Sequence, residues 1–216
     1  MIDITRELDA VQREVSDAQL PSGAARTVRL QRDYDAPIDD VWNALTDPER
    51  IGRWFLPISG DYRLGGTYQF EGNAGGDIVA CERPNRLKVT WVYGPVPEGT
   101  DPSEVEIRLS TIDGGATRFD FRHTATVPEE MWDQFGPGAV GVGWDGGVLG
   151  LGLYLRGGSI DDSEAWQVSE EGREFYKRAS EAWGRANLAT GADPETVAQG
   201  VANTTQFYAP DPAPAS

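Results

Sequence analysis

Six stretches of the chain have the spacing of apolar residues that is typical of β-strands. Between residues 26 and 34, Val28, Leu30 and Tyr34 fall on one side and polar residues fall on the other. Successive side chains of a strand point to opposite faces, so this alternation predicts a strand with one buried face. The other predicted strands are 67–71, 77–83, 86–93, 104–111 and 117–125. Short segments with Gly and Pro separate most of them, which predicts an antiparallel meander with one apolar face.

A helical pattern precedes the first of these strands. Four apolar residues recur at intervals of four, three and four: Ile4, Leu8, Val11 and Val15. This spacing predicts one face of an amphipathic helix over residues 3–19, ended by the Pro-Ser-Gly sequence that follows. Because the opposite face is charged, we expect this helix to dock on the rest of the chain or on a partner.

Further helices are predicted where proline precedes apolar residues at helical spacing. Pro37 and Pro48 each suit the first turn of a short helix. A longer helical pattern runs from Pro128 to Leu155, although eight residues between 136 and 152 are glycine. Each glycine weakens a free helix by about 1 kcal/mol relative to alanine. We therefore interpret these glycines as sites of close packing, with close approach to a ligand as the alternative.

The chain divides into three predicted segments. Residues 1–22 hold the N-terminal amphipathic helix, and residues 23–158 hold the strands and the long glycine-rich helix. Residues 159–216 form a C-terminal helical extension, with helices expected from about Glu164 to Leu188 and from Asp193 to Phe207. The final segment, 211–216, is rich in Pro and Ala and predicts a frayed tail.

The net charge of the chain limits the kinds of molecule that it can bind. The 216 residues include 19 Lys and Arg against 35 Asp and Glu, which gives a net charge of −16. Such an acidic chain repels phosphate backbones and anionic membranes, so we expect no nucleic-acid partner. The apolar stretch 138–155 contains Asp145, whose charge would cost about 3 kcal/mol at the centre of a bilayer. A buried helix is therefore expected there, and no membrane span.

With one histidine and one cysteine, the chain can form few of the usual disulfide and metal sites. Cys81 has no other cysteine with which to form an internal disulfide, which fits a cytoplasmic protein. The usual zinc ligand sets cannot be assembled from His123 and Cys81 alone, so only an all-carboxylate site for a hard cation stays open. No signal peptide is visible at the N-terminus. We expect no metal site and no tightly held cofactor.

Several motifs resemble those of a known superfamily. They are Tyr34-Asp35-Ala36-Pro37, Val41-Trp42-x-Ala44-Leu45-Thr46-Asp47-Pro48-Glu49, Trp54-Phe55, Gly65-Gly66-x-Tyr68-x-Phe70, Phe121-x-His123 and Gly143-Trp144. Over residues 26–156 the chain resembles the START-like (SRPBCC) superfamily, and within it the branch named for the activator of Hsp90 ATPase homologue. The resemblance implies an α+β helix-grip fold, in which a curved antiparallel sheet wraps a long C-terminal helix. The extra N- and C-terminal helices lie outside that resemblance.

The same resemblance implies a cavity between sheet and helix that holds a hydrophobic or amphipathic small molecule. Some members, the aromatic polyketide cyclases, carry out chemistry in that cavity, and the eukaryotic member that names the branch is a co-chaperone. The side chains that we expect to line the cavity are mostly aromatic: Trp54, Tyr68, Phe70, Trp91, Tyr93, Phe121, His123, Trp132, Phe135, Trp144 and Arg32. Arg32 shares the side of its strand with Val28 and Leu30, so it could point inward and anchor a ligand carboxylate, although an exposed arginine at the sheet edge is the favoured alternative. Core packing alone would also explain most of the aromatic residues.

Three hypotheses follow for the function. The first is binding of a small hydrophobic or amphipathic molecule. The second is a cavity enzyme, such as a cyclase, dehydratase or hydrolase, in which His123 and Asp145 handle protons. The third is a protein-interaction or co-chaperone-like module, with a protein partner or a homodimer contacted through the terminal helices. For His123 and Asp145, a structural role is the competing interpretation.

Overall fold

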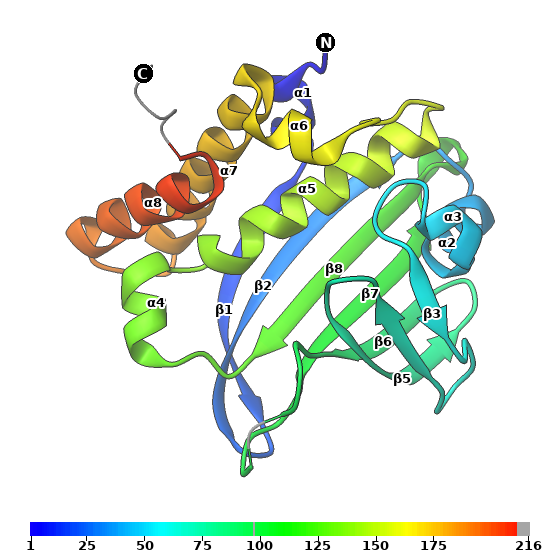
Figure 1. Ribbon diagram of the computed structural model, residues 1–216, viewed down its shortest axis with the longest axis horizontal. Coiled ribbons are helices and arrows are strands. Elements are labelled where there is room, and N and C mark those ends of the chain that lie inside the picture. The colour runs from blue at the N-terminus through cyan, green and yellow to red at the C-terminus, as the bar shows by residue number, and fades with distance from the viewer. Residues whose placement is uncertain (97, 211–216) are drawn as a thin grey trace.

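Eight antiparallel strands form one curved sheet in the computed structural model, which describes residues 1–96 and 98–210 (Figure 1). The strands are β1 (Gln12–Leu20), β2 (Gly23–Tyr34), β3 (Ile58–Gly60), β4 (Thr67–Phe70), β5 (Gly75–Glu82), β6 (Arg86–Trp91), β7 (Ser103–Thr111) and β8 (Thr117–Ala125). Their order across the sheet is β1-β2-β8-β7-β6-β5-β4-β3. All six predicted strands are therefore present, and the two edge strands β1 and β3 are additions.

Helices cover the concave face and one edge of the sheet (Figure 1). They are α1 (Ile4–Asp9), α2 (Ile38–Thr46), α3 (Pro48–Ile51), α4 (Glu129–Phe135), α5 (Gly138–Leu155), α6 (Ser163–Val168), α7 (Glu170–Leu188) and α8 (Pro194–Tyr208). The long helix α5 crosses the concave face, which confirms the predicted helix-grip fold. The pattern that starts at Pro128 is interrupted at Gly136, where a φ of 59° separates α4 from α5.

The prediction of one helix over residues 3–19 is wrong beyond Asp9. Residues 12–20 form the edge strand β1, which pairs with β2 along its whole length and places Val15 opposite Val28. The interval of four between Val11 and Val15 fits a strand as well as a helix, because every second strand residue faces the core. Pairing with β2 decides between the two, and β1 is thus part of the sheet rather than of a separate helical segment.

The glycines of α5 allow close contacts with its neighbours. A Cβ atom on Gly141 would lie 2.2 Å from the ring of Trp183 in α7, so no larger residue fits. A Cβ on Gly152 would lie 3.2 Å from the guanidinium of Arg32. These contacts support the packing interpretation for this face of the helix. On the opposite face, a Cβ on Gly147 would lie an ordinary 3.8 Å from Phe55.

The C-terminal extension packs against the sheet domain. Phe175, Ala179 and Trp183 of α7 are buried, and α7 contacts both α5 and β1. Helix α8 packs on α7 and α4. The predicted tail at 211–216 lies outside the described residues. Within the described part of the chain, no helix is long and apolar enough to cross a membrane.

Candidate functional site

An apolar cavity of about 150 Å³ lies between α5 and the sheet. Alternate residues of β6, β7 and β8 form its floor, because one parity of each strand faces the helix. The α2–α3 region and the segment after it close one side. The lining residues are Leu45, Thr46, Ile51, Trp54, Phe55, Ile58, Tyr62, Tyr68, Phe70, Ile78, Cys81, Leu87, Val89, Trp91, Val105, Ile107, Phe119, Phe121, Trp144, Gly147, Val148 and Leu151.

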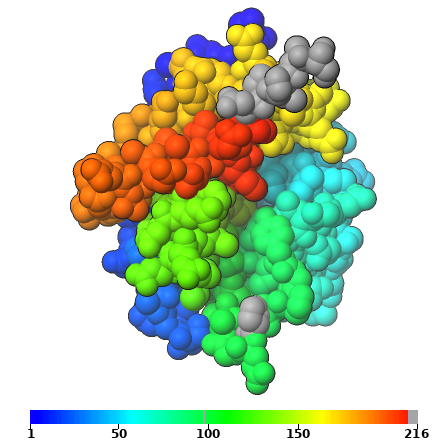
Figure 2. All heavy atoms as spheres, turned by 60° about the vertical axis from the view of Figure 1, so that its left-hand side comes forward, coloured from blue at the N-terminus to red at the C-terminus, as the bar shows by residue number. Residues whose placement is uncertain are grey.

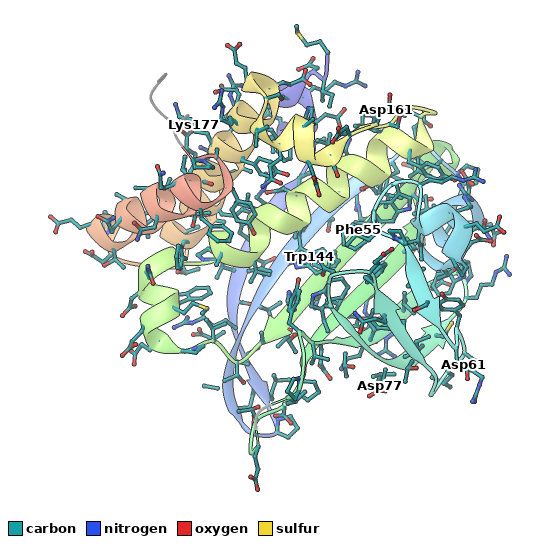
Figure 3. The ribbon with its side chains drawn as sticks, in the orientation of Figure 1. Phe55, Asp61, Asp77, Trp144, Asp161 and Lys177 are labelled. Carbon is teal, nitrogen blue, oxygen red and sulfur yellow. The ribbon has the colours of Figure 1, made fainter. Side chains whose placement is uncertain are left out.

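A cluster of aromatic rings builds one wall of this cavity. Trp144 of α5 points toward the sheet (Figure 3) and its ring centroid lies 4.7 Å from that of Trp91 and 4.3 Å from that of Phe121. Phe55 meets Phe70 edge-on at 5.0 Å. Such tilted and edge-on contacts are the preferred arrangement of aromatic rings, so the wall is held in place by its own packing.

The cavity wall carries almost no free polar groups. None of the lining residues is charged. The Tyr68 hydroxyl donates to the carbonyl oxygen of Thr90 at 2.6 Å, and the Trp54 indole donates to the carbonyl oxygen of Ala44 at 3.0 Å. A molecule in the cavity would therefore meet a largely apolar surface.

Part of the cavity lining reaches the surface. Two of its lining residues are exposed, namely Cys81 in β5 and Tyr62, of which 42% is accessible to solvent. The remaining lining residues are buried or half-buried. We infer that the mouth of the cavity lies beside Tyr62 and Cys81, so that the polar part of a bound molecule can reach water there.

His123 lies next to the cavity wall rather than in it. It is buried on β8 and does not line the cavity. Its Nδ1 accepts a hydrogen bond of 3.0 Å from the indole of Trp144. An imidazole that accepts at Nδ1 carries its neutral-form proton on Nε2, and that atom is buried without a partner among the described residues. Burial lowers the pKa of His123 to about 4, so the ring is neutral at pH 7.

This buried histidine predicts a dependence of stability on pH. The unfolded chain protonates His123 below about pH 6.5 and the folded chain only below about pH 4, so the free energy of unfolding falls as the pH is lowered between these values. The expected loss is roughly 3 kcal/mol, at about 1.4 kcal/mol for each pH unit. His123→Asn keeps an acceptor for Trp144 but cannot titrate. In urea unfolding from pH 7 to 4, the free energy of unfolding of this variant should fall less than that of wild type by this amount. If the variant and wild type lose equal stability, the low pKa of His123 is contradicted.

Asp145 faces away from the cavity. Its carboxylate accepts from Arg13 Nη2 at 2.8 Å and from the Trp183 indole at 2.9 Å, and only 1% of its side chain is exposed. Burial raises the pKa of the Asp145 carboxyl, and the contacts with Arg13 and Trp183 oppose that rise. The expectation that Asp145 handles protons in the cavity is therefore not supported by its position, which ties α5 to β1 and α7.

Arg32 also lies outside the cavity. Its guanidinium forms a buried ion pair with Glu7 of α1, and Glu7 in turn contacts Arg156 at 2.7 Å. The Arg32 side chain is only 5% exposed, so it points inward and the favoured alternative of an exposed arginine at the sheet edge is wrong. Its partner, however, is a carboxylate of the protein itself, which the strand pattern could not reveal because Glu7 is 25 residues away.

Six of the eleven residues that we expected along the cavity do line it: Trp54, Tyr68, Phe70, Trp91, Phe121 and Trp144. Tyr93 is 70% exposed, and Trp132 and Phe135 line a different cleft beside α8. Sequence reasoning missed Phe55 and the aliphatic residues of the floor. The alternation that places Phe121 inward also applies to Phe119 and Val105, so strand parity could have identified those two.

Residues that could hold a metal ion are not gathered at this site. In residues 1–96 and 98–210, no group of three or more His, Cys, Asp or Glu side chains is placed to bind one.

Comparisons with known proteins agree with this architecture. A search of curated proteins found no match. The crystal structure of CalU16 from Micromonospora echinospora is 38% identical, with 82% of this chain and 98% of that chain covered and a TM-score of 0.64. The solution structure of the same protein gives 38% identity, 85% and 97% coverage and a TM-score of 0.67. Protein MLL2253 from Mesorhizobium loti, at 21% identity, 62% and 100% coverage and a TM-score of 0.53, shares the fold.

The family comparison extends over the cavity-forming part of the chain. The family model described as activator of Hsp90 ATPase homolog 1-like protein matches residues 35–146, more than half of the 216 residues. This range includes α2, α3, strands β3 to β8 and the half of α5 that carries Trp144. The curved sheet, the helix across it and the family match together identify the chain: it belongs to the activator of Hsp90 ATPase homolog 1-like family.

Proposed function

We propose that this chain binds a small hydrophobic or amphipathic molecule in the cavity between α5 and the sheet. The observation that carries this proposal is the uncharged lining of a cavity of about 150 Å³ that opens at Tyr62 and Cys81. Removing apolar surface from water contributes about 25 cal/mol for each Å², so an apolar group that fills the space is bound favourably.

The size of the cavity limits the part of the ligand that enters it. An engineered apolar cavity of about 150 Å³ in another protein binds benzene. Pockets that enclose a whole drug-sized molecule have about 300–1,000 Å³. We therefore infer that one ring or a short alkyl group enters, and that the rest of the ligand stays at the mouth.

The geometry favours binding over catalysis. A general base needs a free lone pair within reach of the substrate. The Nδ1 lone pair of His123 is engaged by Trp144, and the Nε2 atom carries the proton. His123 does not line the cavity, and Asp145 is paired with Arg13 on the other side of α5. A cytoplasmic location and a protein partner or homodimer contacted through the terminal helices stay predictions.

Titration with one-ring probes tests this function. We expect toluene to bind and to change the fluorescence of the tryptophans in the cavity wall. Terephthalate has carboxylates at both ends of its ring, so one of them would be buried without a partner, and it should bind at least tenfold more weakly. The comparison uses the full chain at neutral pH. Equal affinity for toluene and terephthalate, or no response to toluene up to its solubility limit, would contradict the proposal.

A further inference from the structure

A second cleft, of about 740 Å³, lies at the sheet edge beside α4, α7 and α8. The start of α5 forms part of its wall, while Trp144 and the other cavity residues do not. Figure 2 shows α4 and α8 side by side on this surface, close to the hairpin of β1 and β2. Trp132 and Phe135, which we had expected in the apolar cavity, lie here instead.

The cleft reaches the open edge of β1. Five consecutive residues of this strand, 13–17, line it. Consecutive strand residues point to opposite faces, so a space that touches all five borders the edge of the strand rather than one face. Strand β1 is the outermost strand of the sheet, with β2 as its only strand neighbour in the described part of the chain.

The pairing of β1 with β2 determines which N–H and C=O groups of β1 point toward the open edge of the sheet. Leu20 pairs with Gly23 across a two-residue turn, so the even-numbered residues of β1 exchange hydrogen bonds with β2. The N–H and C=O groups of Arg13, Val15 and Asp17 therefore point toward the open edge. They have no main-chain partner among the described residues. An unpaired strand edge can accept another extended chain.

An amide side chain in the cleft also lacks a partner. Asn187 near the end of α7 lines the cleft, and only 7% of the residue is exposed. Its side-chain amide makes no hydrogen bond to any described residue, and its nitrogen lies close to Gly136, between α4 and α5. The amide atoms are not fully buried, so they are accessible from the cleft. Asn187 thus offers a donor and an acceptor to a molecule in the cleft.

The charge of the cleft favours a basic occupant. Arg13 is neutralised by Asp145, and Arg26 is paired with Asp17 at 2.9 Å. Asp133 and Asp193 also line the cleft, are exposed and have no ion-pair partner among the described residues. The whole chain has a net charge of −16, which adds to the attraction for cations.

We propose that this cleft binds an extended peptide segment with basic side chains, which adds a strand to the free edge of β1. Main-chain groups of residues 13–17 pair with the peptide, Asn187 binds one of its polar groups, and Asp133 and Asp193 attract its basic side chains. Strand addition takes affinity from main-chain hydrogen bonds and specificity from the side-chain contacts. This site is separate from the apolar cavity and does not depend on the function proposed for it.

The test uses the peptide Lys-Val-Lys-Val-Lys-Val, capped at both ends, and its Glu-Val counterpart. Amide NMR spectra of the full chain should shift at residues 13–17 and at Asn187 with the basic peptide, and much less with the acidic one.

Two variants test the groups that would bind the peptide. Asp17→Pro removes an N–H that points toward the open edge without breaking a hydrogen bond to β2, and should weaken binding at least tenfold. Asn187→Leu should weaken it several-fold because the amide is lost.

Two matched controls isolate the strand edge. Gln19→Pro places proline at another outward position of β1 that does not line the cleft, and should leave the affinity unchanged. Asp17→Ala removes the carboxylate but keeps the N–H, and should bind more tightly than Asp17→Pro. The proposal is overturned if wild-type protein shows no shifts at millimolar basic peptide, or if Asp17→Pro binds like wild type. It is also overturned if these amides shift with protein concentration alone, which would identify a second copy as the occupant.

Discussion

Replacing Gly147 by leucine is expected to lower the affinity for toluene at least tenfold while the protein stays folded. Gly147 lines the cavity, and a Cβ atom there would lie at an ordinary 3.8 Å from Phe55. A leucine side chain would therefore extend into the space of about 150 Å³ that the probe needs. Leucine also favours a helix over glycine by nearly 1 kcal/mol, so the thermal midpoint should not fall. Fluorescence titration and thermal unfolding of the same samples measure both effects.

Gly146→Ala is the matched control for this substitution. Gly146 precedes Gly147 in α5 but does not line the cavity, and a Cβ atom there would lie 3.7 Å from the Tyr176 hydroxyl. This variant should gain helix stability and bind toluene like wild type. If Gly147→Leu is folded and still binds toluene with wild-type affinity, the probe lies elsewhere and the cavity is not the binding site.

Removing the carboxylate of Asp145 should destabilise the fold by about 3–5 kcal/mol, because it leaves the buried Arg13 guanidinium without its counter-charge. The Trp183 indole would lose its acceptor in the same variant, Asp145→Ala. Only 7% of the Arg13 side chain and 1% of the Asp145 side chain are exposed, so water cannot replace the lost contacts. Urea unfolding measures the difference in the free energy of unfolding.

A double variant tests whether the loss of stability comes from the unpaired charge of Arg13 or from lost packing. Arg13→Met together with Asp145→Leu replaces both charges by apolar groups, which in other proteins costs little or even stabilises. The double variant should therefore be more stable than Asp145→Ala. A double variant that is less stable than Asp145→Ala would mean that the apolar replacements fail to pack, and a loss below 1 kcal/mol for Asp145→Ala would contradict the buried pair.

Local alternation was enough to predict the strands beneath the cavity, and local spacing was not enough to predict the edge strand β1. The inward set Val105, Ile107 and Leu109 repeats at every second residue, and β7 is observed over those positions. In β1 the apolar residues are sparse, because one edge and one face of the strand are outside the core. Its identity as a strand depends on pairing with β2, which the spacing within 3–19 does not contain.

For the polar candidates too, the sequence indicated the position of a residue on its strand or helix but not its partners. Sequence position placed His123 correctly on the inward face of β8 but could not show that Trp144, on a helix 21 residues away, binds its Nδ1. The partners Arg13 for Asp145 and Glu7 for Arg32 are 132 and 25 residues away along the chain. Contacts at such separations are created by the fold, so the sequence shows that a buried polar residue is present without showing what satisfies it.

Methyl NMR of the wild-type chain during titration with toluene tests the central claim most directly. Methyl groups of Val105, Val148 and Leu151 line the cavity, whereas those of Val11, Leu20 and Val197 are buried elsewhere. We predict shifts that saturate with toluene in the first set and stay near zero in the second. If the cavity methyl groups do not respond, or if both sets shift alike, the cavity does not bind apolar molecules and the proposed function is wrong.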